Sequence, residues 1–237
     1  MINTILLDMD GTLLPVDNET FTHTYFKLLC AKLMPYGYQP ADIVRGLRSG
    51  MVAMVKNDGT RTNREAFWDD FTKTLGEDVR KMEPVCDEFY GNEFNKAKDI
   101  LGLNVDRRPL IELLHSKGYR VVLANNPMLP PPGTNSRLSW LSLNAADFDL
   151  VTDYSNSTYC KPNPDYYREI VRKVGAQPEE CLMVGNSLTD DATAAQAGCD
   201  VYIVTDALEG DVNELNKYKH GTFAEFCKLV EELPKVN

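Results

Sequence analysis

The stretch "ILLDMDGTLL", residues 5 to 14, contains the feature that decides the fold. Three aliphatic residues lead into two aspartates, Asp8 and Asp10, and Gly11 and Thr12 follow directly. An apolar run that ends at a glycine predicts a short buried strand over residues 3 to 8. Two like charges at the tip of a buried strand repel each other, so a positive partner is expected beside them.

The chain beyond residue 109 alternates between two patterns. Apolar runs that predict strands occupy residues 119–124, 149–153, 181–185 and 200–205. Amphipathic runs that predict helices occupy residues 110–118, 136–143, 164–175 and 188–198. This alternation predicts an α/β fold with a Rossmann-like parallel sheet, to which the strand carrying Asp8 also belongs. Residues 20 to 95 show only helical spacing, which predicts an all-helical insert.

Composition narrows the class of protein. The net charge of −10 and the pI near 4.8 argue against nucleic-acid or anionic membrane partners. No apolar run approaches the roughly 18 residues of a membrane span, and the N-terminus lacks a signal-peptide pattern. Six scattered cysteines favour free thiols in a reducing compartment. We therefore expect a cytoplasmic monomer or homodimer that binds neither membrane nor nucleic acid.

Ligands of parallel α/β sheets bind beyond the carboxyl ends of the strands, so polar residues there are site candidates. The residues at these positions are Asp8, Asp10, Asn125, Asn126, Lys161, Asn186, Ser187, Asp190 and Asp191. A carboxylate at a strand tip can attack a phosphoryl group, and a neighbouring carboxylate can move the proton. A lysine and a divalent cation such as Mg²⁺ would relieve the repulsion between the acids.

These segments together resemble the four motifs of the haloacid dehalogenase superfamily, whose members are mostly magnesium-dependent phosphatases. The D-x-D-G-T motif at Asp8 matches fully, and Lys161 precedes a proline as the third motif requires. The resemblance implies a core domain of residues 1–15 and 100–237 and an α-helical cap domain of residues 16–99. It also implies hydrolysis of a small phosphorylated metabolite through an aspartyl-phosphate on Asp8.

The resemblance also assigns roles to the other candidates. Asp10 would be the acid/base, and Lys161 would neutralise the nucleophile and the phosphate. Asn125 and Asn126 would contact the phosphate, although the family has threonine or serine at the first of these positions. Mg²⁺ would be held by Asp8, the backbone carbonyl of Asp10, Asn186 and Asp191, with Asn186 replacing a customary aspartate. These are the expectations that the structure has to meet.

Several alternatives stay open at this point. The pair Asp8 and Asp10 alone also suits a turn, and the sequence S-x-x-D ending at Asp190 suits a helix cap. The same core could serve a phosphomutase, or a haloacid dehalogenase that needs neither Asp10 nor a metal. A further alternative is a non-catalytic binding protein, whose best support is the two asparagines that depart from the motifs, Asn125 and Asn186. Five basic residues of the insert are either anion contacts or solvated charges, namely Arg45, Arg48, Lys56, Arg61 and Arg64.

Overall fold

A computed structural model describes residues 1–236 of the chain. The strands are β1 (Thr4–Leu7), β2 (Arg120–Leu123), β3 (Leu150–Val151), β4 (Cys181–Gly185), β5 (Asp200–Val204) and β6 (Lys219–Gly221). The helices are α1 (Asn18–Leu33), α2 (Pro40–Val55), α3 (Asn63–Leu75), α4 (Glu83–Gly91), α5 (Lys96–Ile100), α6 (Arg108–Ser116), α7 (Pro131–Trp140), α8 (Pro164–Val174) and α9 (Phe223–Glu232). Short 3₁₀ helices join several of these elements, and one of them, η6 (Asp191–Ala197), belongs to the site.

All six strands form one parallel sheet in the order β3-β2-β1-β4-β5-β6. The strand β1 lies at its centre, where Leu7 is paired with Leu123 of β2 and Val184 of β4. The predicted α/β fold with a parallel sheet is therefore confirmed. The tips of β1, β2 and β4 lie side by side, and so do the loops that follow them.

The sheet is buried on both faces, as parallel sheets require. Successive side chains point to opposite faces, so Ile5 and Leu7 join one apolar cluster while Leu6 joins the other. Helices α6 and α9 cover the first face, and α8 with η6 covers the second. Because both faces are covered, residues 5 to 7 of β1 are all apolar instead of alternating with polar residues.

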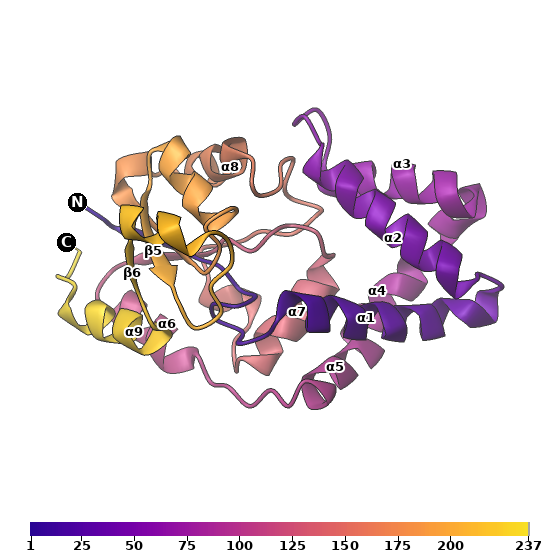
Figure 1. Cartoon of the computed structure of the whole chain (residues 1–237), viewed down its shortest axis with the longest axis horizontal. Helices are drawn as coiled ribbons and strands as arrows, with labels where there is room; N and C mark the ends of the chain where they lie inside the picture. The colour runs from indigo at the N-terminus through magenta and orange to yellow at the C-terminus, as the bar shows by residue number, and fades with distance from the viewer. Residues whose placement is uncertain (237) are drawn as a thin grey trace.

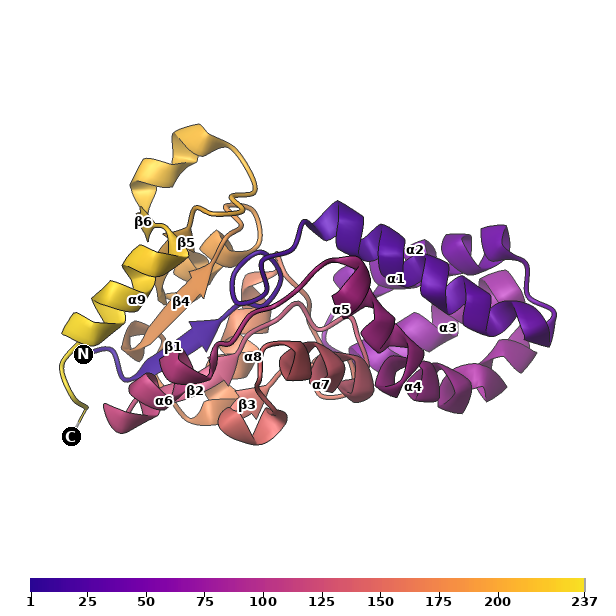
Figure 2. The same cartoon turned by 90° about the horizontal axis from the view of Figure 1, so that it is seen from below.

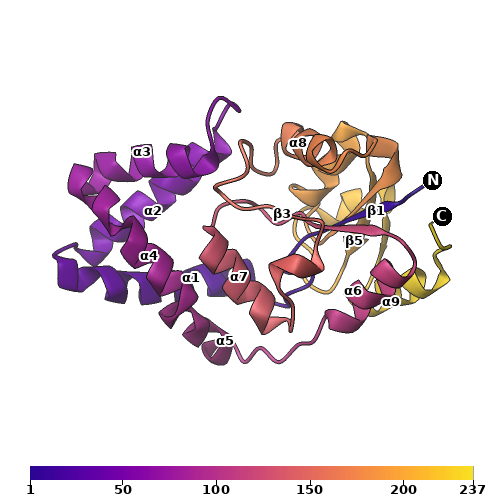
Figure 3. The ribbon, with the colours of Figure 1, turned by 180° about the vertical axis from the view of Figure 1, so that it is seen from behind.

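Helices α1 to α5, residues 18–100, form a separate helical body that we call the insert. It leaves the sheet after β1 and returns to it at α6, and it contains no strand in the described part of the chain. The insert lies on the side opposite both chain ends, as Figures 1 and 2 show. Helix α7 lies between the sheet and the insert and packs against α4, which is clearest in Figure 3.

Three details differ from the sequence-based expectations. Residues 188–198 do not form an α-helix; the segment is the 3₁₀ helix η6, which begins at Asp191. Helix α7 starts at Pro131 instead of residue 136, because prolines suit the first helical turn, where no N–H is needed. The edge strand β6 was not predicted, since its three residues are polar or small and half-exposed or exposed.

In residues 1–236, none of the helices combines the length and the apolar character needed to cross a lipid bilayer.

Candidate active site

The candidate active site lies where the tips of β1, β2 and β4 face the insert. A cavity of about 330 Å³ opens there, lined by residues of the sheet loops, of α7 and of insert helices α1 to α4. All the residues singled out at the strand ends line this cavity, and they come from four separate segments of the chain. The structure thus brings together Asp8, Asp10, Asn125, Asn126, Lys161, Asn186, Ser187, Asp190 and Asp191.

Lys161 joins two buried carboxylates at the centre of the site. Its Nζ atom lies 2.7 Å from Asp8 Oδ1 and 2.6 Å from Asp191 Oδ1. All three side chains are buried, and Lys161 reaches them from the loop that precedes α8. Lys161 is therefore the positive partner expected beside Asp8, and it is not a solvated surface lysine.

Burial dominates the ionisation of this cluster. It raises the pKa of Asp8 to about 7, although Lys161 opposes the shift, and the Asp191 charge adds to it. Burial alone would lower the pKa of Lys161, but the charges of Asp191 and Asp8 outweigh it and raise that pKa. The proton therefore stays on the lysine, which remains a cation between two acids.

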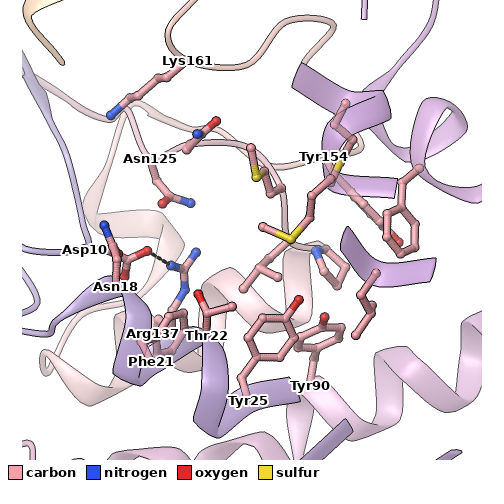
Figure 4. Close-up of a pocket in the computed structure, with 18 of the residues that line it drawn as sticks. Asp10, Asn18, Phe21, Thr22, Tyr25, Tyr90, Asn125, Arg137, Tyr154 and Lys161 are labelled. Atoms are coloured by element: carbon pink, nitrogen blue, oxygen red, sulfur yellow. Dashed lines mark hydrogen bonds and ion pairs between the residues drawn. The ribbon is translucent and has the colours of Figure 1, made fainter. Parts of the chain in front are cut away.

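Asp10 turns away from this cluster and pairs with Arg137 of α7. The guanidinium Nη1 lies 2.6 Å from Asp10 Oδ2, and the arginine is almost fully buried (Figure 4). The other oxygen, Asp10 Oδ1, is buried without a hydrogen-bond partner in the described residues. Arg137 therefore fixes the carboxylate by one oxygen and leaves the second available.

Asn125 follows β2 and is held through its backbone. Its carbonyl accepts hydrogen bonds from the hydroxyls of Tyr166, at 2.7 Å, and Thr152, at 2.8 Å. Its side-chain Nδ2 is buried and has no partner within residues 1–236, and Figure 4 shows the amide directed into the cavity. A buried donor without a partner costs free energy of folding. This N–H is therefore a candidate to donate a hydrogen bond to a bound ligand. Asn126 beside it also carries an unpaired buried atom, Oδ1.

Asn186 follows β4 and is held from two sides. Its Nδ2 donates to the Ala207 carbonyl at 2.6 Å, and its Oδ1 accepts from the Thr12 hydroxyl at 3.2 Å. The amide packs directly over Gly11, whose φ of +79° is left-handed. A Cβ at Gly11 would overlap this amide, so glycine is needed there for both conformation and space.

The two acids after Asn186 have different environments. The Ser187 hydroxyl accepts from the Asp190 backbone N–H at 3.1 Å, as in a capping box. The reciprocal bond does not come from Asp190: Asp191 Oδ2 accepts the Ser187 backbone N–H at 2.9 Å. Of the two roles left open for Asp190, the structure therefore does not support the helix cap, because its side chain makes no capping hydrogen bond. The Asp190 carboxylate lines the cavity, and burial raises its pKa.

A metal at this site has to fit the oxygens that are present. Among residues 1–236, no three His, Cys, Asp or Glu side chains gather closely enough to hold an ion. Asp10 is paired with Arg137, and Asp8 and Asp191 are both paired with Lys161. Asp8 Oδ2 has no hydrogen-bond partner in this part of the chain, and the Asn186 oxygen faces the β1 loop. Carboxylate, amide and backbone oxygens are the hard donors that Mg²⁺ prefers, so the donor set fits Mg²⁺ with less charge than three acids would supply.

The basic residues of the insert do not reach the cavity. Arg45 pairs with Asp42 and Arg61 with Asp69, both at 2.7 Å on the surface. Arg64 is bound by Glu83 through two contacts of 2.5 and 2.8 Å. Arg48 and Lys56 are also absent from the cavity lining. Of the two alternatives left open for these residues, the structure therefore favours surface charges over contacts to an anion in this cavity.

Sequence reasoning missed three residues that shape the site: Arg137, Thr152 and Tyr166. Thr152 follows a strand that the pattern had identified, so inspection of that strand end would have found it. Arg137 offers a weaker signal, an arginine near the start of the segment "SRLSWLSL", whose apolar residues follow it. Tyr166 lies in an amphipathic helix whose pattern does not separate packing from positioning.

Comparisons with known proteins bear on the same region. The chain matches the haloacid dehalogenase-like hydrolase family over residues 2–198. It is similar to the pyrophosphatase PpaX of Bacillus cereus strain AH820, with 23% identity over 212 residues, 88% of this chain and 86% of that protein. Its fold is similar to that of a HAD phosphatase from Thermococcus onnurineus, with a TM-score of 0.63, 20% identity, and coverage of 99% of this chain and 100% of that one. It is also similar to L-2-haloacid dehalogenase from Xanthobacter autotrophicus, with a TM-score of 0.55, 14% identity, and coverage of 98% and 100%.

Proposed function

Because the chain belongs to the haloacid dehalogenase-like hydrolase family, we propose that it hydrolyses a small organic phosphate monoester with the help of Mg²⁺. The observation that carries this proposal is the pairing of a buried acid with an unsatisfied donor across one cavity. Asp8 lines the cavity with one oxygen bound to Lys161, and Asn125 directs an unpaired N–H into the same space. A tetrahedral anion bound in the cavity would accept a hydrogen bond from the Asn125 amide and lie beside Asp8.

Asp8 would act as the nucleophile. One of its oxygens attacks phosphorus, the ester P–O bond breaks, and an aspartyl-phosphate forms. Lys161 supports the attack because its fixed positive charge is close to both the nucleophile and the incoming phosphoryl oxygens. Asn125 donates to a phosphoryl oxygen, and Asn126 is a second contact at the same end of the cavity.

Asp10 would move the proton. In its protonated form, Asp10 gives the proton on its free oxygen, Oδ1, to the leaving oxygen as the ester bond breaks, and becomes a carboxylate. The same oxygen then takes a proton from the water that attacks the aspartyl-phosphate, which releases phosphate and restores Asp8. Arg137 is a positioning residue in this scheme, because it holds the other oxygen of Asp10.

Mg²⁺ would be held by Asp8, the backbone carbonyl of Asp10, Asn186 and Asp191. When bound, it neutralises charge on the phosphoryl group and on the surrounding acids. The insert would act as a cap that excludes water and bulky substrates from the cavity.

Phosphate release from p-nitrophenyl phosphate tests the proposal. We expect release that depends on Mg²⁺, stops with EDTA, and falls at least a thousandfold in Asp8→Asn. Absence of release at any Mg²⁺ concentration would overturn the phosphatase proposal, and equal release by Asp8→Asn would overturn the nucleophile. Chloride release from 2-chloropropionate that resists EDTA would identify a dehalogenase instead.

A further inference from the structure

The cavity continues from the catalytic residues into the insert, where its wall changes character. The lining there is aromatic or apolar and belongs to α1, α2, α3 and α4: Phe21, Tyr25, Met54, Trp68, Phe71 and Tyr90. Figure 4 shows the rings of Tyr25 and Tyr90 side by side, with their hydroxyls directed into the cavity. Burial raises the pKa of both hydroxyls, so they are neutral donors. This half of the cavity suits an apolar or aromatic group.

The cationic side chains that line the cavity are already paired with carboxylates. Only two cationic side chains line it among residues 1–236, Lys161 and Arg137. Lys161 is bound by Asp8 and Asp191, and Arg137 is bound by Asp10. A phosphoryl group can bind Lys161 together with the two acids. A second anionic group of the same substrate would find no unpaired cation among the described residues that line the cavity.

Asp87 of α4 brings a negative charge to the insert side of the cavity. Asp87 is one of the residues that line the cavity, and its carboxylate has no hydrogen bond or ion pair within residues 1–236. The charge of Arg64 acts on Asp87, but Arg64 itself is held by both oxygens of Glu83. Burial and the neighbouring Glu83 charge raise the pKa of Asp87, and the Arg64 charge opposes them only in part. An anionic group in this half of the cavity would therefore meet a partly buried acid that repels it.

From these contacts we infer that the substrate carries one phosphoryl group on an uncharged, aromatic or apolar leaving group, and that Asp87 rejects substrates with a second anion. The inference rests on the proposed phosphatase function and gives it a substrate class. A volume of about 330 Å³ lies near the lower end of the roughly 300–1,000 Å³ typical of small-molecule sites, so the leaving group is small. Pyrophosphate, the substrate in the name of the relative PpaX, falls outside this class.

A matched pair of substrates tests the inference. The esters 4-carbamoylphenyl phosphate and 4-carboxyphenyl phosphate have nearly the same size and differ by one negative charge. We expect kcat/KM of the wild-type protein to be at least tenfold higher for the neutral ester, and pyrophosphate to be the poorest of the three substrates. Asp87→Asn should reduce the preference for the neutral ester at least threefold, mainly by lowering KM for the anionic one.

Glu88→Gln is the matched control, because Glu88 is the next residue of α4, is exposed, and does not line the cavity. It should leave the preference unchanged, and melting curves should show that both variants are folded. Equal kcat/KM for the two esters, or a preference for the carboxylate or for pyrophosphate, would overturn the inference and leave the phosphatase proposal intact. An unchanged preference in Asp87→Asn would overturn the role of Asp87. Failure to hydrolyse all three compounds and p-nitrophenyl phosphate would instead be the failure of the proposed function.

Discussion

At the scale of single residues, the side-chain amide of Asn125 is a buried donor that has no hydrogen-bond acceptor within residues 1–236. Its backbone carbonyl, in contrast, accepts a hydrogen bond from Tyr166. A hydrogen bond to a charged acceptor contributes about 1.5–3 kcal/mol, which corresponds to about ten- to hundredfold in rate. We expect Asn125→Asp to lower kcat/KM for p-nitrophenyl phosphate by at least a hundredfold, because the donor becomes an acceptor with negative charge.

Asn125→Ser is the matched control, because serine keeps a donor at this position. It should lose less than tenfold. Steady-state kinetics at saturating Mg²⁺ make the comparison, and equal activity of Asn125→Asp and the wild type would show that this amide does not contact the phosphate.

The buried acid Asp8 predicts a dependence of stability on pH. Its pKa in the folded protein is about 7, above the 3.8 of an exposed aspartate, so the folded state binds this proton more tightly than the unfolded chain does. Ionisation of Asp8 therefore destabilises the folded protein. This effect is smallest below pH 4 and grows with pH until the pH passes about 7.

Asp8→Asn removes this titration. The quantity to follow is the free energy of unfolding of Asp8→Asn minus that of the wild type, both measured in EDTA. From the size of the pKa shift, we expect this difference to rise by roughly 3 kcal/mol between pH 5 and pH 8. Urea unfolding at several pH values measures the difference. A difference that stays constant with pH would show that Asp8 ionises at its ordinary pKa.

At the scale of elements, strands β1 to β5 and their tips were predictable because they depend on local patterns, whereas the short polar edge strand β6 was not. A short apolar run bounded by glycine identifies β1, and the polar residues after β1, β2 and β4 follow from the rule for parallel sheets. The family resemblance drawn from these residues is confirmed by the match over residues 2–198. The order of the strands and the partner of Asp10 were not predictable, because both depend on contacts between distant segments. Arg137 lies 127 residues from Asp10, and no local pattern joins them.

The turn after β1 makes an element-scale prediction through Gly11. Gly11→Ala should destabilise the protein by about 1–2 kcal/mol because of its positive φ, and should also displace the Asn186 amide that packs on it. If Asn186 helps to hold Mg²⁺, the Mg²⁺ concentration for half-maximal activity rises several-fold.

Gly37→Ala separates these two effects. Gly37 has a similar φ of +93°, but a Cβ there meets no atom within 4 Å. Its alanine variant should lose stability and keep the wild-type Mg²⁺ requirement. The proposed part of Asn186 in metal binding would be contradicted if both alanine variants showed the same requirement.

At the scale of the whole molecule, the insert is attached to the core by more than its two connecting segments. The backbone N–H of Asn63, at the start of α3, donates to the Ser157 carbonyl at 2.8 Å, and the next N–H donates to Tyr154 at 2.7 Å. The fully buried side chain of Asn63 donates to the Tyr159 carbonyl at 3.1 Å and to Cys160 Sγ at 3.2 Å. These contacts join the insert to the loop that carries Lys161, so the position of the insert and that of the lysine are coupled.

Asn63→Leu keeps the size of the side chain and removes its hydrogen bonds to the core. We expect a loss of about 1–3 kcal/mol in stability, because buried polar groups are left unpaired. Amide hydrogen exchange should become faster both at the start of α3 and in residues 153–161, and kcat should fall because Lys161 is held less firmly. Asn92→Leu is the control, since the Asn92 side chain donates only to Glu88 within the insert, at 3.0 Å. Faster exchange confined to α3 would show that the insert and the Lys161 loop move independently.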